Sequence, residues 1–289
     1  MTNLATFRNE NLRATVNLEN GQLVSLVSNG TEFFHDGGKP SFKGLGWRHS
    51  EIIAFPIFGP PGKDFKVRVD DKEYYLEQHG LTRFTEGNPF KLTKLKDGEI
   101  NLVQNYKGQD VVNPKYQPGT NHPKTLNWMP YRLEKKLKLS GKELIYEATI
   151  KNTSDADMPY MIGTHPAFKI FGKLEDSCFF DEKDRFFTTL SEVIKDSKDP
   201  SKNAFYADGV SEITYRDSKG GVGVKVSSND FNKTMLWCPG YDEGMFCIEH
   251  LSKFPKLSEQ DYFEHPEDFE LLSPGKEKTY SISIQPIPI

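Results

Sequence analysis

The sequence predicts an all-β fold, a single large antiparallel β-sandwich, on three observations. Short runs of alternating or continuously apolar residues fill the 289-residue chain, and turn signals separate them at regular intervals. Aromatic residues make up 12% of the chain, which is typical of a sheet-rich protein. No segment has the long, capped pattern of an α-helix, so strands and helices do not alternate as in an α/β fold.

The expected strands follow one another from the N-terminus, joined by turns such as Lys96-Asp97-Gly98. The clearest strand lies at 131–140, YRLEKKLKLS, where apolar and polar residues alternate with a period of two. The other strands are expected at 12–18, 21–28, 65–71, 72–78, 99–106, 142–152, 222–228, 233–238, 245–250 and 278–287.

The segments between these strands are short, with one exception. Residues 106–123 are rich in Pro, Gly and Asn and predict a long surface loop, and a loop of that length is either functional or mobile. Single helical turns are expected only near 183–203 and 257–268. No repeat or linker divides the chain, so residues 1–289 are predicted to form one domain.

Composition excludes several classes of function. The formal net charge of −4 and a pI near 6.0 give no basic footprint for nucleic acid or an anionic membrane. The N-terminus lacks the pattern of a signal peptide, and no apolar run is long enough to span a membrane. The cysteines, Cys178, Cys238 and Cys247, are odd in number and lack metal-like spacing. A reduced, cytoplasmic compartment is therefore expected, with Cys247 as a small core residue.

The first candidate site residue is His165, in NTSDADMPYMIGTHPAFKI, residues 152–170. An apolar run that predicts a strand precedes it, and Pro166 restricts the backbone behind it. Imidazole exchanges protons near neutral pH, so this histidine suits proton transfer. An ordinary hydrogen-bonded histidine fits the same pattern.

A second candidate is Glu249, which ends the apolar run of residues 245–248. Burial would raise its pKa toward the range that suits a general base, whereas an outward position on an edge strand would leave it ordinary. Trp237 and Asp242 precede it. An indole face and a carboxylate suit a sugar ring, although a tryptophan in the core is the simpler alternative.

A third stretch holds His79 and Arg83. Gly80, between them, permits a sharp turn or a close approach of backbone to a ligand, and the arginine could donate to hydroxyls or a carboxylate. A polar hairpin turn is the alternative. No spacing of ligand residues fits a zinc or calcium site, and no nucleophile elbow or phosphate-loop motif occurs. The remaining histidines have no evident partner and are expected mostly at the surface: His35, His49, His122, His250 and His265.

Five stretches together resemble the aldose 1-epimerase (galactose mutarotase-like) family, and most closely its branch of small bacterial mutarotase-related proteins. They occur in the family's order and at roughly its spacing. They are AFPIFG (54–59), QHGLTR (78–83), the segment from YRL to THPAF (131–168), LWCPGYDEGMFCIE (236–249) and LLSPGKEKTYSISI (271–284).

The resemblance implies a β-supersandwich with a sugar cleft on a concave sheet face. It also implies that His165, in the HPAF motif, is the general acid and that Glu249 is the general base of anomer interconversion. His79 would then polarise the ring oxygen of the sugar. The two catalytic side chains would face each other across a gap one pyranose wide.

The resemblance also implies that Arg83 lines the same pocket and that Asp242 matches an acidic position that contacts sugar hydroxyls, with Trp237 beside it as a substrate-binding candidate. The implied partner is a small aldose, with no metal or other cofactor, and the protein is expected to be a monomer or a homodimer. This chain departs from the family pattern at Pro60, where an arginine is usual, at Thr164, and at His250-Leu251.

The function expected from these residues is an aldose 1-epimerase (mutarotase), a cofactor-independent isomerase of carbohydrate metabolism, acting on a free aldose. A non-catalytic sugar-binding protein on the same fold is one alternative, and a structural sandwich without a small ligand is another. A hexose-6-phosphate mutarotase is a third and would need a basic cluster at the cleft edge, for which Arg48, Lys63 and Arg83 are the candidates.

Overall fold

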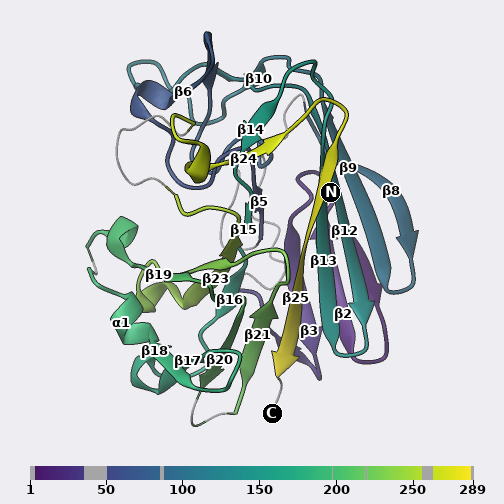
Figure 1. Cartoon of the computed structure of the whole chain (residues 1–289). Helices are drawn as coiled ribbons and strands as arrows, with labels where there is room; N and C mark the ends of the chain where they lie inside the picture. The colour runs from purple at the N-terminus through teal and green to yellow at the C-terminus, as the bar shows by residue number, and fades with distance from the viewer. Residues whose placement is uncertain are drawn as a thin grey trace.

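Antiparallel sheets dominate the structure, a computed structural model that describes residues 4–35, 51–84, 88–196, 198–217, 219, 221–255 and 263–287. The largest sheet has nine strands, and its long central strands run side by side at the right of Figure 1. In sheet order they are β18 (Phe186–Thr189), β17 (Ser177–Phe180), β20 (Glu212–Asp217), β21 (Gly223–Ser227), β25 (Glu277–Ile287), β13 (Glu143–Asn152), β12 (Tyr131–Ser140), β9 (Glu99–Tyr106) and β8 (Lys91–Lys96).

A six-stranded sheet lies to the left of those long strands in Figure 1 and carries the candidate site. Its strand β23 is central, because other strands pair with both of its edges. In sheet order the strands are β19 (Ala204–Asp208), β22 (Lys233–Trp237), β23 (Met245–Leu251), β15 (Gly163–Thr164) and β5 (Ile53–Ala54), while β16 (Ala167–Lys169) also pairs with β23.

The remaining elements are small. A four-stranded sheet at the N-terminus contains β1 (Leu4–Arg8), β2 (Leu12–Asn17), β3 (Leu23–Ser28) and β4 (Thr31–Glu32). Three strand pairs are β6 (Lys66–Val69) with β7 (Lys72–Tyr75), β10 (Val111–Val112) with β11 (Thr125–Leu126), and β14 (Met158–Tyr160) with β24 (Glu270–Leu272). The helices are α1 (Leu190–Val193) and the 3-10 turns η1 (Lys63–Phe65), η2 (Leu174–Asp176), η3 (Pro200–Lys202), η4 (Tyr241–Glu243) and η5 (Pro266–Asp268).

The core forms where the two large sheets pack on each other. On β12 and β13 buried residues alternate with more exposed ones, as the period-two pattern predicts. Aromatic pairs bridge the sheets: the rings of Tyr215 and Phe246 are 4.2 Å apart, and those of Phe55 and Tyr131 are 4.9 Å apart. One hydrophobic cluster extends from Ala5 to Ile284. The prediction of one domain over residues 1–289 is not tested further and stays a prediction, with this continuous core in its support.

The all-β prediction is confirmed, and the helices near 183–203 are single turns as expected. The second expected helical region, 257–268, lies partly outside the described residues, and its described part contains η5. The prediction for 106–123 needs correction, because β10 pairs with β11 there and Asn113 is buried. Within the described part of the chain, no helix has the length and apolar character needed to cross a membrane.

Candidate functional site

Strand β23 positions Glu249 inside the six-stranded sheet. All seven residues of β23 are buried, and Glu249 has an exposed fraction of 0%. Because β22 pairs with one edge of β23 and β15 and β16 pair with the other, β23 is not an edge strand. The outward-facing alternative for Glu249 is therefore wrong. Side chains alternate along a strand, so Glu249 shares one face with Cys247 and Met245, while His250 points to the opposite face.

The register of the same sheet places His165 opposite Glu249. Gly163 pairs with Leu251 and Ala167 pairs with Cys247, so the residue midway between them falls opposite residue 249. The backbone N–H of His165 donates to the carbonyl of Ile52 at 3.1 Å. Because β15 ends at Thr164, His165 directly follows it, which confirms its expected position at a strand end.

Glycine at position 163 permits this arrangement. A Cβ atom there would lie 2.5 Å from Cδ2 of Leu251 and 2.5 Å from Cδ2 of Phe58. Real Cβ atoms do not approach other atoms so closely, so with a larger residue the side chain of Leu251 or Phe58 would have to move. Gly163 thus lets these two side chains pack directly against the backbone of β15.

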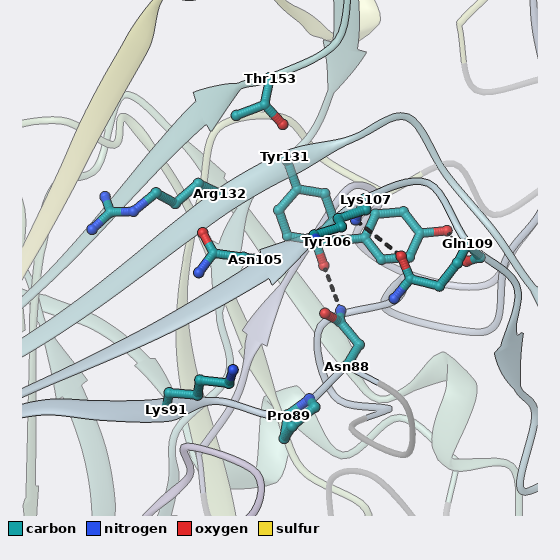
Figure 2. A pocket seen from close by; sticks show the side chains of 10 residues that line it. All are labelled: Asn88, Pro89, Lys91, Asn105, Tyr106, Lys107, Gln109, Tyr131, Arg132 and Thr153. Atoms are coloured by element: carbon teal, nitrogen blue, oxygen red, sulfur yellow. Dashed lines mark hydrogen bonds between the residues drawn. The ribbon is translucent and has the colours of Figure 1, made fainter.

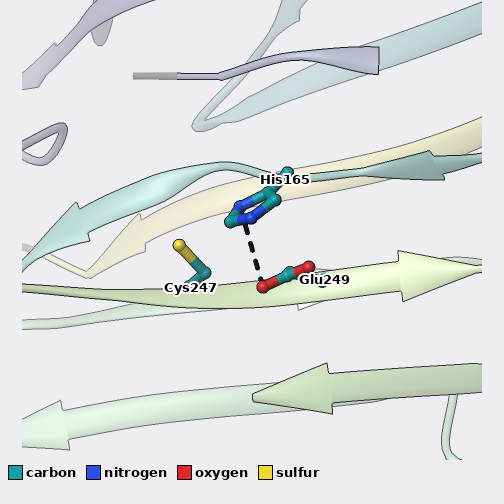
Figure 3. Close-up of side chains that lie close together, drawn as sticks. All are labelled: His165, Cys247 and Glu249. Atoms are coloured by element: carbon teal, nitrogen blue, oxygen red, sulfur yellow. Dashed lines mark ion pairs between the residues drawn. The ribbon is translucent and has the colours of Figure 1, made fainter. Parts of the chain in front are cut away.

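The two candidate catalytic side chains face each other closely. Nδ1 of His165 is 3.6 Å from Oε1 of Glu249, as Figure 3 shows. This gap is narrower than the pyranose-wide gap expected from the sequence.

The carboxylate of Glu249 is buried without a hydrogen bond from the described part of the chain. Neither of its oxygens accepts a hydrogen bond from any described residue. Burial raises its pKa well above the ordinary value of 4.5. A buried carboxylate with a raised pKa and free lone pairs can take a proton from a substrate hydroxyl near neutral pH.

His79 is held beside His165 by an unusual backbone. Its φ of +65° lies in the left-handed region, and its own N–H donates to the carbonyl of Gly59. The N–H of Gly59 in turn donates to Nδ1 of His79 at 3.2 Å. The rings of His79 and His165 are 5.0 Å apart, edge to face.

The charge state of His79 follows from this environment. Its pKa lies well below 6.5, first because of burial and then because of positive charge on His165, Arg83 and Lys115. Nδ1 accepts a hydrogen bond from the N–H of Gly59, and Nε2 lies 3.3 Å from the side-chain amide nitrogen of Gln78, so the neutral ring has a partner at both nitrogens.

Trp237 and Asp242 occupy different positions relative to this pair. The Trp237 ring, on β22, lies 5.7 Å from the His165 ring, and its Nε1 donates to the carbonyl of Pro200. Asp242 is exposed on η4, and no hydrogen bond or ion pair joins it to a described site residue. The structure brings Trp237 to the pair and leaves the role of Asp242 a prediction.

Arg83 is buried, with an exposed fraction of 7%, and its guanidinium lies over the ring of Phe84 at 5.0 Å. Burial lowers its pKa to about 10, so it stays protonated at neutral pH. Of the other cations considered for a phosphate, Arg48 and the side chain of Lys63 lie outside the part of the chain that the structure describes.

A cluster around Glu77 escaped prediction. Glu77 has an exposed fraction of 1% and forms ion pairs with Lys115, at 3.3 Å, and with His122. Asn113 donates to the same carboxylate at 2.9 Å. Although burial opposes it, the hydrogen bonds from Asn113 and His122 and the charge of Lys115 lower the pKa of Glu77. The long loop thus folds against the segment that carries His79, and the expectation that His122 is a surface residue without a partner is wrong.

His250 also differs from expectation, because it is fully buried. Its ring bonds to Thr234 at 3.0 Å and stacks parallel to Phe231. Burial lowers its pKa to about 4. At the departure from the family pattern, His250 is therefore part of the core and Leu251 packs against Gly163. Neither side chain lies between His165 and Glu249.

One group of described side chains has the donors and the proximity to hold a metal ion. Ligand atoms of His165, Cys247 and Glu249 all lie within 4.8 Å of one another (Figure 3). Their spacing in the sequence, with two residues on one strand and one on another, gives no metal motif. The acid–base chemistry considered below uses the histidine and the glutamate directly.

A hollow of the described surface lies away from these residues. It has a volume of about 710 Å³ and opens near the ends of β9 and β12, as Figure 2 shows. Its polar lining includes Asn88, Lys91, Asn105, Lys107 and Arg132. None of the predicted site residues lines it, so the chemistry of the side chains, and not the size of a cavity, marks the candidate site.

Comparison with known proteins agrees with this fold. No family model matches the chain. Two curated relatives, the chromosomal and plasmid forms of protein LacX from Lactococcus lactis subsp. lactis, are each 24% identical over 314 residues, covering 96% of this chain and 98% of theirs.

Solved structures resemble the chain over almost its whole length. A galactose mutarotase-like protein from Lactobacillus casei has a TM-score of 0.75 at 18% identity, covering 98% of this chain and 99% of that one. A galactose mutarotase related enzyme from Lactobacillus acidophilus has a TM-score of 0.74 at 18% identity, covering 98% and 97%. A GalM/aldose epimerase homologue from C. elegans has a TM-score of 0.63 at 11% identity, covering 99% and 98%. The chain therefore has the galactose mutarotase-like fold, and the resemblance seen in its sequence is confirmed at that level.

Proposed function

We propose that this protein is an aldose 1-epimerase, which interconverts the α and β anomers of an aldose sugar. The observation that carries the proposal is the pairing of His165 with Glu249 in sheet register, at 3.6 Å, with both carboxylate oxygens of Glu249 unbonded. The galactose mutarotase-like fold and the five sequence stretches support it. Fold alone does not fix function, so the site must carry the argument.

Interconversion of anomers needs two simultaneous proton transfers, at the two oxygens bonded to C1 of the sugar. Glu249 removes the proton from the C1 hydroxyl while His165 delivers a proton to the ring oxygen O5, and the C1–O5 bond breaks. Rotation about C1–C2 exposes the other face of the carbonyl. Closure reverses both transfers, so the pair returns to its starting state and the scheme consumes no cofactor. Positioned proton transfer of this kind contributes about 10²–10⁴-fold to the rate.

The neighbouring side chains assist this step. His79, whose ring lies 5.0 Å from that of His165, helps to hold and polarise the ring oxygen O5 as charge develops there. Trp237 offers an aromatic surface beside His165. The family resemblance assigns Asp242 to the sugar hydroxyls and Arg83 to the lining of the same pocket. His165 and Glu249 are 4% and 0% exposed, so a sugar reaches them only after the side chains that cover them shift.

Polarimetry on freshly dissolved single anomers of hexoses, pentoses, uronic acids and sugar phosphates tests the proposal. We expect at least one sugar to approach equilibrium faster with the enzyme than without it. If no sugar is accelerated but one binds, the protein is a non-catalytic sugar-binding protein. The burial of His165 and Glu249 under other side chains favours this alternative. In that case the proposed reaction would be wrong.

A further inference from the structure

Three different metal-ligand groups meet on one face of the six-stranded sheet. The imidazole of His165, the thiol of Cys247 and the carboxylate of Glu249 each offer one ligand atom, and these atoms lie within 4.8 Å of one another (Figure 3). Cys247 and Glu249 are two residues apart on β23, so their side chains point to the same face. His165 reaches that face from the neighbouring segment, because the register places it opposite Glu249.

Glu249 needs a partner that the described residues do not supply. Its exposed fraction is 0%, and neither carboxylate oxygen accepts a hydrogen bond from the described part of the chain. The cross-strand neighbours of Cys247 are Ala167, which has no polar side-chain atom, and Trp237, whose N–H donates to Pro200. A buried carboxylate without a partner is costly. A cation bound at its oxygens would remove that cost.

The ligand types and their spacing favour zinc. Thiolate, imidazole and carboxylate are the groups that bind Zn²⁺ in proteins, whereas Mg²⁺ and Ca²⁺ take oxygen ligands. In a tetrahedral zinc site the ligand atoms lie about 3.3–3.6 Å apart. Nδ1 of His165 and Oε1 of Glu249 are already 3.6 Å apart. The other pairs are no longer than 4.8 Å, so they need to close by only about 1 Å.

The charges of a zinc complex at this place balance. A thiolate and a carboxylate carry two negative charges and a neutral imidazole carries none, so a divalent cation cancels them, and the displaced protons pass to water. We propose that His165, Cys247 and Glu249 form a binding site for Zn²⁺. This inference goes beyond the proposed function and does not depend on it. Because the ion takes the lone pairs of the proposed base, zinc and sugar should compete for the same residues.

Titration of the reduced wild-type protein with Co²⁺, followed by absorbance, tests the site directly. A cysteine sulfur bound to Co²⁺ gives a charge-transfer band in the near ultraviolet. We expect this band to saturate at one equivalent, to vanish when Zn²⁺ is added, and to be unaffected by an excess of Mg²⁺. Absence of the band, or its loss to Mg²⁺ as readily as to Zn²⁺, would overturn the inference.

The variant Cys247→Ser tests the residues, with Cys178→Ser as the matched control, because Cys178 lies on β17, outside the cluster. Cys247→Ser should lose the band and bind Zn²⁺ at least about tenfold more weakly, whereas Cys178→Ser should keep both. A second variant, Glu249→Gln, keeps the thiol and decides the matter if Cys247→Ser does not fold. It should keep the band at saturation but bind Zn²⁺ at least about tenfold more weakly. A wild-type affinity for Zn²⁺ in either folded variant would overturn the site.

The failure of this inference can be told apart from the failure of the proposed function. The cobalt band requires no turnover, so a protein that epimerises no sugar but shows the band at one equivalent retains the zinc site. Epimerisation without the band leaves the proposed function and removes the zinc site. In an active protein, saturating Zn²⁺ should abolish anomer exchange, and a chelator should restore it. A full rate of exchange with zinc bound would show that the ion lies elsewhere.

Discussion

The chemistry of Glu249 follows from its place on a central strand. Every side chain of β23 is buried, so the carboxylate has lost its water, and no described residue replaces that water with a hydrogen bond. The uncharged form is favoured in such a place. A carboxyl in such a place suits the exchange of a proton, which is the role proposed for it.

The raised pKa of Glu249 predicts the pH dependence of the reaction. Burial moves its pKa well above 4.5, and a general base must be ionised to act. The rate constant kcat/KM should therefore rise with pH through a midpoint well above 4.5, because this parameter reports the groups of the free enzyme. Polarimetric rates between pH 4 and 8, corrected for spontaneous mutarotation, measure this midpoint. A midpoint at or below the value for an ordinary carboxyl would contradict the assignment.

His165, Glu249 and His79 could be proposed from the sequence because each lies in a contiguous motif: His165 directly after β15, Glu249 within β23, and His79 in the turn after β7. The contacts of Glu77 with Lys115 and His122 could not, because they join residues 38 and 45 positions apart through a loop without periodicity.

At the scale of elements, the segment before Arg83 is shaped by close contact between backbones. Gly80 has a φ of +78°, and a Cβ atom there would lie 2.1 Å from the carbonyl oxygen of Phe55. The N–H of Leu81 donates to that same oxygen at 2.8 Å. Glycine at position 80 thus lets the segment that carries His79 and Arg83 lie against residue 55.

Two glycine variants test this contact. Gly30 has a φ of +80° and open space around it, whereas Gly80 has nearly the same φ and a backbone oxygen in the way. Both Gly30→Ala and Gly80→Ala incur the left-handed backbone cost of about 1–2 kcal/mol. Gly80→Ala should lose roughly 2 kcal/mol more by urea unfolding, because its Cβ overlaps the oxygen, and it should also lose anomer exchange. Equal destabilisation of the two variants would show that the contact has no consequence.

The elements themselves were predictable to different degrees. The strands β12 and β13 could be predicted because buried residues alternate with less buried ones over all ten positions of each strand. The two-residue strands β5 and β15 were not, because two residues cannot show a period. They are nevertheless the strands that place His165.

At the scale of the whole molecule, a buried ion pair joins the nine-stranded sheet to the segment before β5, and hydrogen bonds extend it to the N-terminal sheet. Lys135, on β12, contacts Glu51 and donates to the carbonyl of Gly21 at 2.6 Å. Tyr146, on β13, donates to Glu51 at 2.7 Å, and the N–H of Leu23 donates to the same carboxylate. Lys135 is at one of the alternate positions of YRLEKKLKLS whose side chains face inward, so its burial could be predicted from the sequence. Its partner Glu51 could not, because it lies 84 residues away.

Removing the cation of this pair should destabilise the protein. In Lys135→Met the Glu51 carboxylate stays buried without its positive charge, which should cost about 3–5 kcal/mol. Urea unfolding measures the loss, and Lys138→Met, an exposed position on the same strand, is the control. The double variant Lys135→Met with Glu51→Gln should recover most of the stability. A single variant within about 1 kcal/mol of the wild type would show that the pair does not hold the sheets together.

The rate of α–β anomer exchange, measured by NMR, tests the central proposal most directly in wild type, Glu249→Gln and Glu243→Gln. Glu243 is exposed near the same strand, so its variant controls for the amide substitution. We predict that Glu249→Gln loses at least about 100-fold of the catalysed exchange while the affinity for sugar stays within a few-fold, and that Glu243→Gln behaves as wild type. A near-normal exchange rate in Glu249→Gln would contradict the account.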